Sequence, residues 1–263
     1  MPWRRADIRL RLIRNDTPVP AFLPEAIHDV IPISDDNPAR RPAVVAWAII
    51  VLCVLAYLWE WSLGREMNAA LDIFGFVPAN YFSGHNDSAG LAIPPAVTIF
   101  TSMFLHGGLL HIAGNMLYLW IFGNNVEDAI GHLRFLVFYL VCGAAAALGM
   151  AYIDPASRIP MVGASGAISG VLAAYVLLYP RHRITVIVPL GIILYPLSIT
   201  AIWVVGFWFL MQLISAGFSD PGKPGTAWWA HVAGFAAGLL LTPILKARDV
   251  PLFAPPRRGP WDR

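Results

Sequence analysis

The chain has 263 residues, of which 57% are hydrophobic and only 13% are charged, and its formal net charge is +2. Soluble proteins average about 25% charged residues, so this composition excludes an ordinary soluble domain and a disordered chain. Two cysteines are too few for a disulfide scaffold, and so small a net charge argues against nucleic acid as a partner.

Charged residues concentrate at the two ends of the chain. Residues 1–41 and 246–263 hold 20 charged residues in 59 positions, whereas residues 42–245 hold 14 in 204. We therefore predict a polar basic N-terminal tail at 1–41, a membrane domain at 42–246 and a basic C-terminal tail at 247–263. The N-terminal tail has no apolar segment of the kind that a cleavable signal peptide needs. We expect part of residues 1–30 to be mobile.

Six apolar stretches divide the central region, and most approach the roughly 20 residues that a helix needs to cross a bilayer. The predicted spans are residues 43–63, 98–123, 134–153, 163–180, 197–217 and 227–246. Alternating segments typical of a membrane barrel are missing, so we predict an all-α polytopic membrane protein. The segment 184–196 contains Pro189 and Pro196, and we interpret it as a connection or an irregular start of the fifth span.

The positions of lysine and arginine predict the orientation. With both termini cytoplasmic, the inner segments hold 15 Lys and Arg residues and the outer loops hold only Arg65, Arg158 and Lys223, which is the bias expected of cytoplasmic loops. Glu60 then lies at the outer end of the first span, where we expect it to reach water. The outer loop 218–226 is rich in glycine and proline and is expected to be mobile.

Polar side chains at membrane depth are costly and therefore mark candidate functional positions. The candidates are His106, His111, Asn115, Ser165, Ser169, Gln212 and His231. In the predicted topology, four of them fall at a similar depth on the outer side of spans two, four and six: His111, Asn115, Ser165 and His231.

Small residues predict a close approach of the fourth and sixth spans. The positions with little or no side chain are Gly163, Gly166 and Gly170 on the fourth span and Ala230, Gly234 and Gly238 on the sixth. If these two faces meet, Ser165 and His231 come within hydrogen-bond reach.

These residue types suggest acyl-transfer chemistry. A serine nucleophile needs an adjacent base, most often histidine, and the tetrahedral intermediate needs hydrogen-bond donors such as histidine or asparagine. No carboxylate is expected at this depth, so we predict a dyad of Ser165 and His231. Taken singly, each residue keeps a simpler interpretation, such as helix packing for the serine or a hydrogen bond between helices for Asn115.

Three other functions stay open on the residues alone. A zinc protease would use His106, His111 and His231 as ligands, but the HExxH motif is missing. A non-catalytic protein that binds or escorts other transmembrane segments would not need Ser165. A transporter is disfavoured because the sequence has no internal repeat. We expect neither a metal nor a cofactor.

Three motifs resemble those of the rhomboid intramembrane serine proteases. Residues 104–132 resemble the family's second-span motif, residues 163–166 its active-site signature, and residues 230–238 its last-span histidine motif. The resemblance covers about residues 33–246. It implies a six-span bundle of the bacterial inner (plasma) membrane, with cytoplasmic termini and an active site that opens to the outer side.

The resemblance also implies residue roles. Ser165 would be the nucleophile and His231 the general base. The oxyanion hole would comprise His111, Asn115 and the backbone N–H of Ser165, supported by Gly163. Structural roles are implied for His106, Glu127, Gly131, Gly166, Gly234 and Gly238. The implied activity is hydrolysis of a peptide bond in or near the transmembrane segment of single-span or multi-span membrane proteins, with the lipid bilayer as the other partner.

Two positions depart from the family pattern. Ala129 stands where many members have arginine, so we expect an inner-side ion pair to be missing, with an effect on stability. Ser169 stands where some members have an aromatic residue stacked on the histidine. We therefore expect His231 to be held differently, although neither departure removes a catalytic group.

Overall fold

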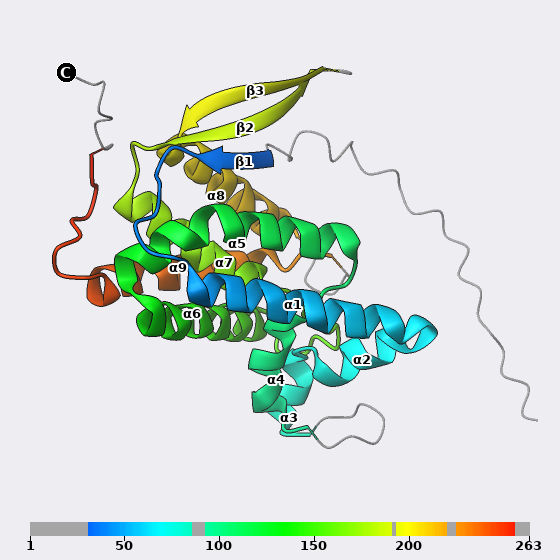
Figure 1. Cartoon of the computed structure of the whole chain (residues 1–263). Helices are drawn as coiled ribbons and strands as arrows, with labels where there is room; N and C mark the ends of the chain where they lie inside the picture. Colours follow the sequence, from blue (N-terminus) through cyan, green and yellow to red (C-terminus); the bar gives the residue numbers. More distant parts are fainter. Residues whose placement is uncertain (1–30, 86–92, 191–192, 220–224, 256–263) are drawn as a thin grey trace, which may run out of the picture. The chain divides into compact units, whose positions relative to one another are not determined.

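The structure is a computed structural model of the chain, and it describes residues 31–85, 93–190, 193–219 and 225–255 (Figure 1). Residues 1–30 of the predicted N-terminal tail, with their predicted mobility, lie outside these ranges, as do residues 256–263 of the predicted C-terminal tail and the middle of the loop 218–226.

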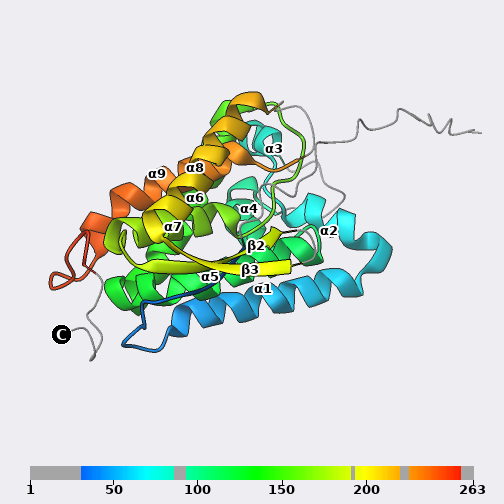
Figure 2. The same ribbon diagram turned by 90° about the horizontal axis from the view of Figure 1, so that it is seen from above.

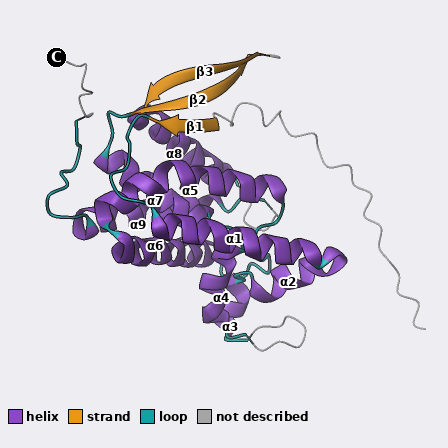
Figure 3. Cartoon of the chain, in the orientation of Figure 1, coloured by secondary structure: helices purple, strands orange, loops and turns teal. Residues whose placement is uncertain are grey.

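Most of the described chain is helical (Figure 3). The helices are α1 (Val44–Ser62), α2 (Met67–Phe74), α3 (Pro78–Ser83), α4 (Pro95–Thr101), α5 (Leu109–Ile130), α6 (His132–Ile153), α7 (Ser165–Leu178), α8 (Ala201–Phe218) and α9 (Trp228–Leu245). Two short 3-10 helices lie at Gly64–Glu66 and Ser102–Phe104. The strands are β1 (Ile31–Asp35), β2 (Arg183–Leu190) and β3 (Ile193–Thr200).

Four helices of the described chain, α1, α6, α8 and α9, are long and apolar enough to cross a membrane. The segment Pro95–Phe104 and α5 form a pair bent by 81° that counts as a fifth span if taken together. Helix α7 has 14 residues, about 21 Å at 1.5 Å per residue, which is shorter than the hydrocarbon core. The prediction of a helical membrane bundle is thus confirmed in its coarse form, while the count of six spans stays a prediction.

Helix α7 forms the core of this bundle. Its side chains are almost all buried, and it packs against α9, α6 and α5 (Figures 1 and 2). The helices around it expose large apolar side chains instead, among them Trp47, Val51 and Leu55 on α1 and Trp203, Phe207 and Leu210 on α8. So much exposed apolar surface is unusual in water and fits a hydrocarbon solvent.

Glycine controls the contact between α7 and α9. A Cβ atom at Gly234 would overlap the carbonyl oxygen of Gly166, and one at Gly238 would overlap that of Gly170. The small faces of the fourth and sixth predicted spans therefore meet, backbone against backbone. The first turns of the two helices, which carry Ser165 and His231, are brought together by this crossing.

A three-stranded antiparallel sheet, in the order β1-β2-β3, corrects the all-α prediction (Figure 1). Strands β2 and β3 occupy the segment interpreted as a connection or as the start of the fifth span, and α8 begins only at Ala201. In β2 the buried Ile184 and Val186 alternate with the exposed Arg183 and the partly exposed Thr185, which is the period of a strand. The high apolar content of this stretch masked that period.

Candidate active site

Ser165 is the first residue of α7 and is partly exposed. The first N–H groups of a helix have no acceptor within the helix, and the helix dipole gives this end a partial positive charge. A developing negative charge beside Ser165 would therefore meet backbone donors as well as side chains.

His231 lies in the first turn of α9 and contacts Ser165 directly. Its Nε2 atom is 2.8 Å from the Ser165 hydroxyl oxygen, across 66 residues of sequence. Its Nδ1 atom is 2.8 Å from the amide oxygen of Gln212 on α8. His231 and Gln212 are both buried, with exposed fractions of 8% and 6%.

Two side chains of α5 lie over the loop that precedes Ser165. His111 and Asn115 are one helical turn apart, and a Cβ atom at Gly163 would lie 2.7 Å from Nε2 of His111 and 3.6 Å from Nδ2 of Asn115. Gly163 has a φ of +120°, a conformation that favours glycine. The Nδ2 atom of Asn115 is buried and has no acceptor within the described chain.

His106 and Glu60 hold the segment that leads into α5. The backbone N–H of His106 donates to the carboxylate of Glu60, at 3.3 and 3.2 Å to its two oxygens. The ring of His106 packs edge-on against that of His111, with an angle of 70° between the ring planes. Glu60 is fully buried, so the expectation that it reaches water is wrong. The chain before α5 folds back onto the end of α1 and covers the carboxylate, a contact for which the sequence gives no signal.

Glu127 and Gly131 lie at the other end of α5. The Glu127 carboxylate accepts the backbone N–H groups of Val45 and Ala46, at 2.9 and 2.7 Å, and so caps the first turn of α1 from a neighbouring helix. Gly131, with a φ of +90°, makes the turn between α5 and α6. Ala129 is buried, and its carbonyl accepts the N–H of Ala247.

The surroundings of His231 differ from the family pattern at one position. Ser169 is buried, and its hydroxyl donates to the backbone carbonyl of Ser165 at 2.7 Å. Two tryptophans that the sequence analysis missed, Trp208 and Trp228, each have a ring centroid 6.1 Å from that of His231. Trp208 lies one turn before Gln212 on α8, and this spacing is the only sequence signal that could have linked it to the site.

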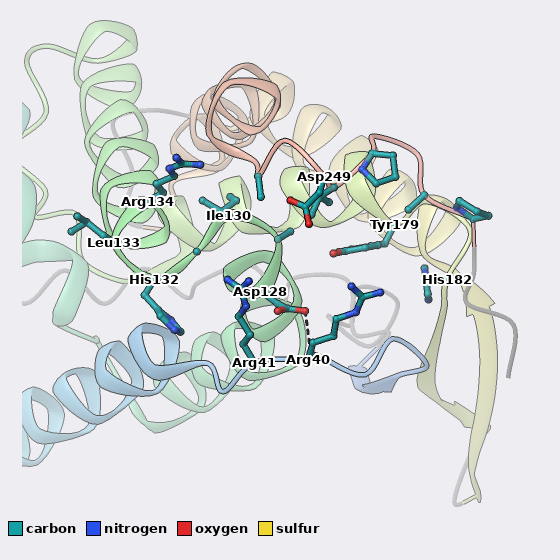
Figure 4. Close-up of a pocket in the computed structure, with 17 residues that line it drawn as sticks. Arg40, Arg41, Asp128, Ile130, His132, Leu133, Arg134, Tyr179, His182 and Asp249 are labelled. Atoms are coloured by element: carbon teal, nitrogen blue, oxygen red, sulfur yellow. Dashed lines mark hydrogen bonds between the residues drawn. The ribbon is translucent and has the colours of Figure 1, made fainter. Parts of the chain in front are cut away.

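A separate cavity of about 620 Å³ lies at the end of α5 that carries Glu127 (Figure 4). Its charged lining side chains are Arg40, Arg41, Asp128, Arg134 and Asp249. Asp128 accepts the backbone N–H of Arg40 at 3.0 Å. Among the residues that the structure describes, no serine or cysteine lines this cavity, so it offers no second candidate for a serine or cysteine nucleophile.

The three histidines of the zinc alternative do not form a ligand set. The ring of His231 faces Ser165, whereas His106 and His111 contact each other. Throughout the described residues, no three His, Cys, Asp or Glu side chains are grouped so as to hold a metal ion.

Comparison with known families adds to this geometry. The family model of the Rhomboid domain matches residues 95–248, a range that includes Ser165, His231, His111 and Asn115. The chain belongs to the rhomboid family. The resemblance recognised in the sequence motifs is thereby confirmed, and this rhomboid chain is a multi-pass membrane protein.

Two curated relatives illustrate the relationship. The rhomboid protease GlpG of Salmonella choleraesuis is 25% identical over 204 residues, which are 77% of this rhomboid chain and 63% of GlpG. The human mitochondrial presenilin-associated rhomboid-like protein is 33% identical over 156 residues, which are 58% of this chain and 36% of that protein. The chain thus spans less than two thirds of the length of either relative.

Proposed function

We propose that this rhomboid protein is an intramembrane serine endopeptidase that hydrolyses a peptide bond in or near the transmembrane segment of membrane-protein substrates. The observation that carries the proposal is the 2.8 Å contact between the Ser165 hydroxyl and Nε2 of His231. A serine becomes an effective nucleophile when a neighbouring base can take its proton. One relative is named a rhomboid protease, GlpG, and this supports the same activity for the present chain.

In the proposed first step, Ser165 Oγ attacks the substrate carbonyl carbon while Nε2 of His231 takes the hydroxyl proton. The carbonyl oxygen becomes an oxyanion, which accepts hydrogen bonds from the side chains of His111 and Asn115 and from the N–H of Ser165. The buried Nδ2 donor of Asn115 gains its acceptor at this moment. Since no group of the described chain competes for this donor, it is free to turn to the oxyanion.

In the proposed second step, the tetrahedral intermediate collapses and the peptide C–N bond breaks. The imidazolium of His231 gives its proton to the leaving amine, and Ser165 keeps the acyl group as an ester. Water, deprotonated by His231, then attacks the ester carbonyl. As the bond from this carbon to Ser165 Oγ breaks, the imidazolium of His231 returns the proton to Oγ and the new carboxyl terminus is released. The proposed roles of His106, Glu127, Gly131 and the helix-packing glycines are structural.

The proposed topology has six spans and places the site in the outer half of a bacterial inner membrane. The excess of lysine and arginine on the inner side supports cytoplasmic termini. Helix α7 serves as the fourth span even though it has only 14 residues, because it is enclosed by other helices. Since it begins at Ser165, its shortness would set the nucleophile below the outer surface, within reach of water from that side.

The substrate must present an extended backbone to Ser165. In a helix the peptide groups are hydrogen-bonded to one another and shielded by side chains, so a transmembrane substrate must unwind locally before attack. We expect preferred cleavage next to small or helix-breaking residues. The α8 helix is the proposed gate for entry.

The direct test is cleavage of a single-span model substrate in liposomes by the wild type, Ser165→Ala and His231→Ala, with and without a metal chelator. We expect cleavage by the wild type that persists in chelator and is lost in both variants. Cleavage that survives in Ser165→Ala would rule out the serine mechanism, and sensitivity to chelator would favour a metal. Tight binding of the substrate without cleavage by the folded wild type would favour an escort function.

A further inference from the structure

The proposed function uses only one of the two ring nitrogens of His231. The other, Nδ1, is 2.8 Å from the amide oxygen of Gln212. Gln212 belongs to α8, and it is the buried polar side chain among the buried residues of that helix, which are otherwise Ala201, Val205 and Ala216. A polar group in such an apolar setting is costly unless it is hydrogen-bonded.

The orientation of the Gln212 amide follows from its second contact. The amide nitrogen donates to the backbone carbonyl of Trp208 at 3.4 Å. If the amide were flipped, its oxygen would face that carbonyl oxygen, and neither could donate. The amide oxygen therefore faces His231, and since this oxygen can only accept, Nδ1 of His231 carries the proton.

A proton on Nδ1 has a consequence for the other nitrogen. In a neutral imidazole only one nitrogen carries hydrogen, so Nε2 is left as an acceptor pointing at the Ser165 hydroxyl, 2.8 Å away. This is the tautomer that a general base for serine requires. In a Ser-His-Asp triad a buried carboxylate sets this tautomer and the ring orientation.

We propose that Gln212 is the positioning residue of this site, holding His231 in the orientation and tautomer that accept the Ser165 proton. The inference rests on the proposed function and adds a third member to its dyad. A neutral amide suits a buried position in a membrane because it avoids the desolvation of a carboxylate. Trp208 and Trp228 restrict the ring sterically, but their ring faces and edges do not distinguish the two tautomers.

The placement of Gln212 makes the base depend on α8. The contact between α8 and α9 beside the site includes the stacked rings of Phe209 and Phe235, 4.0 Å apart. Helix α8 must pack against α9 for the Gln212 oxygen to reach Nδ1 of His231. The small Ser169 on α7 provides no aromatic ring to hold His231. In this proposal, Gln212 on α8 holds the His231 ring instead.

The test compares three variants in the liposome cleavage assay. Gln212→Met keeps the length of the side chain without the acceptor, Gln212→Glu keeps an acceptor oxygen, and Leu213→Met is a control on the exposed side of α8. We expect Gln212→Met to lower kcat about 10- to 100-fold, the range seen for groups that orient a metal-ligating histidine, with KM unchanged. The thermal midpoint should fall by several degrees at most, because the buried Nδ1–H of His231 loses its acceptor. Gln212→Glu should retain most of the wild-type kcat, and Leu213→Met all of it.

A wild-type kcat in Gln212→Met would overturn the inference, as would an equal loss of kcat in Gln212→Met and Gln212→Glu. A second measurement needs no variant: nitrogen NMR of histidine-labelled wild type should show His231 with its proton on Nδ1, and a proton on Nε2 would contradict the proposal. The two hypotheses fail separately. If the wild type shows no cleavage that depends on Ser165, the proposed function fails; if it does, and Gln212→Met is fully active, only this inference fails.

Discussion

At the residue scale, Gly163 has the most demanding position in the candidate site. Its φ of +120° is unfavourable for any residue with a side chain, and its missing Cβ leaves room for His111. We predict that Gly163→Ala lowers kcat at least ~100-fold, the cost of losing an oxyanion donor, because the new methyl group displaces the His111 ring. The measurement is kcat in the liposome assay.

Gly114→Ala is the matched control, because Gly114 lies on the same helix as His111 and an added Cβ there meets nothing within 4 Å. It should keep the wild-type kcat. Equal activity of Gly163→Ala and Gly114→Ala would show that the close approach of residue 163 to His111 has no role in the reaction.

Replacement of Asn115 should affect activity much more than stability. Since its buried Nδ2 donor has no acceptor within the described chain, the side chain contributes little through hydrogen bonding to the resting fold. We predict that Asn115→Ala lowers kcat by ~100-fold or more while the thermal midpoint in detergent changes by only a few degrees. A large fall in the midpoint with a preserved kcat would instead assign Asn115 a structural role.

The sequence selects single residues where chemistry demands a residue type, but it does not reveal contacts that only folding decides. Ser165 and His231 were selected from the sequence because polar groups at membrane depth are rare, and the structure brings them together. Gln212 was selected for the same reason, but its partner was not, since nothing local relates α8 to His231. The Glu60 contact depends on the chain folding back before α5 and has no local pattern.

At the scale of elements, the crossing of α7 and α9 sets the geometry of Ser165 and His231. Gly234 lies so close to the Gly166 carbonyl that a methyl group would force the helices apart. We predict that Gly234→Ala lowers the free energy of unfolding by about 1–3 kcal/mol, the usual cost of overpacking, and also lowers kcat. Thermal unfolding and cleavage assays would check this.

Gly206→Ala serves as the control, since an added Cβ at Gly206 on α8 meets nothing within 4 Å. It replaces glycine by alanine within a helix, as Gly234→Ala does, and should not destabilise the protein. If both variants behave like the wild type, the α7–α9 contact is more tolerant than the close backbone approach indicates.

We predict that the stability of the protein depends on pH through Asp35, a carboxylic acid in the sheet. The carboxylate of Asp35 in β1 accepts hydrogen bonds from Tyr175 on α7 and Asn125 on α5, at 2.6 and 2.8 Å. Burial raises the pKa of Asp35 from 3.8 to about 6, although the hydrogen bond from Tyr175 acts in the opposite direction. The folded state therefore favours the neutral acid, so the stability from this group is fully present below pH 3.8 and is lost as the pH rises through about 6.

We predict that Asp35→Asn, which stays neutral, flattens the fall of the thermal midpoint between pH 4 and pH 7.5. The difference from the wild type should be several degrees, since about 1 kcal/mol corresponds to roughly 2–4 °C in a chain of this size. Parallel pH profiles for the two proteins would mean that Asp35 has the same pKa in the folded and unfolded states.

The sequence predicted the long apolar helices but not the strands β2 and β3, for a physical reason. Hydropathy finds apolar helices because the bilayer demands about 20 apolar residues, and α1, α6, α8 and α9 meet this demand. The same measure misjudged β2 and β3, whose alternating faces are both rich in apolar residues. The second predicted span, residues 98–123, contains a bend of 81° that hydropathy does not detect, and the regular helix α5 begins only at Leu109.

At the scale of the whole molecule, the proposed orientation can be tested with single cysteines, because the native Cys53 and Cys142 are buried. Arg65 and Arg181 are exposed at opposite ends of the bundle in the proposed topology. We predict that a membrane-impermeant maleimide labels Arg65→Cys in intact cells and labels Arg181→Cys only after permeabilisation. The reverse pattern would invert the topology and move the site to the cytoplasmic side.

The central claim for the whole molecule is that a membrane bundle activates one serine. Covalent labelling of the wild type in liposomes with a fluorophosphonate, followed by mass spectrometry of the peptides, tests this most directly because it needs no knowledge of the natural substrate. The account predicts a single adduct on Ser165 that is lost in His231→Ala. The absence of an adduct on Ser165 in a protein that still cleaves the single-span model substrate would contradict it.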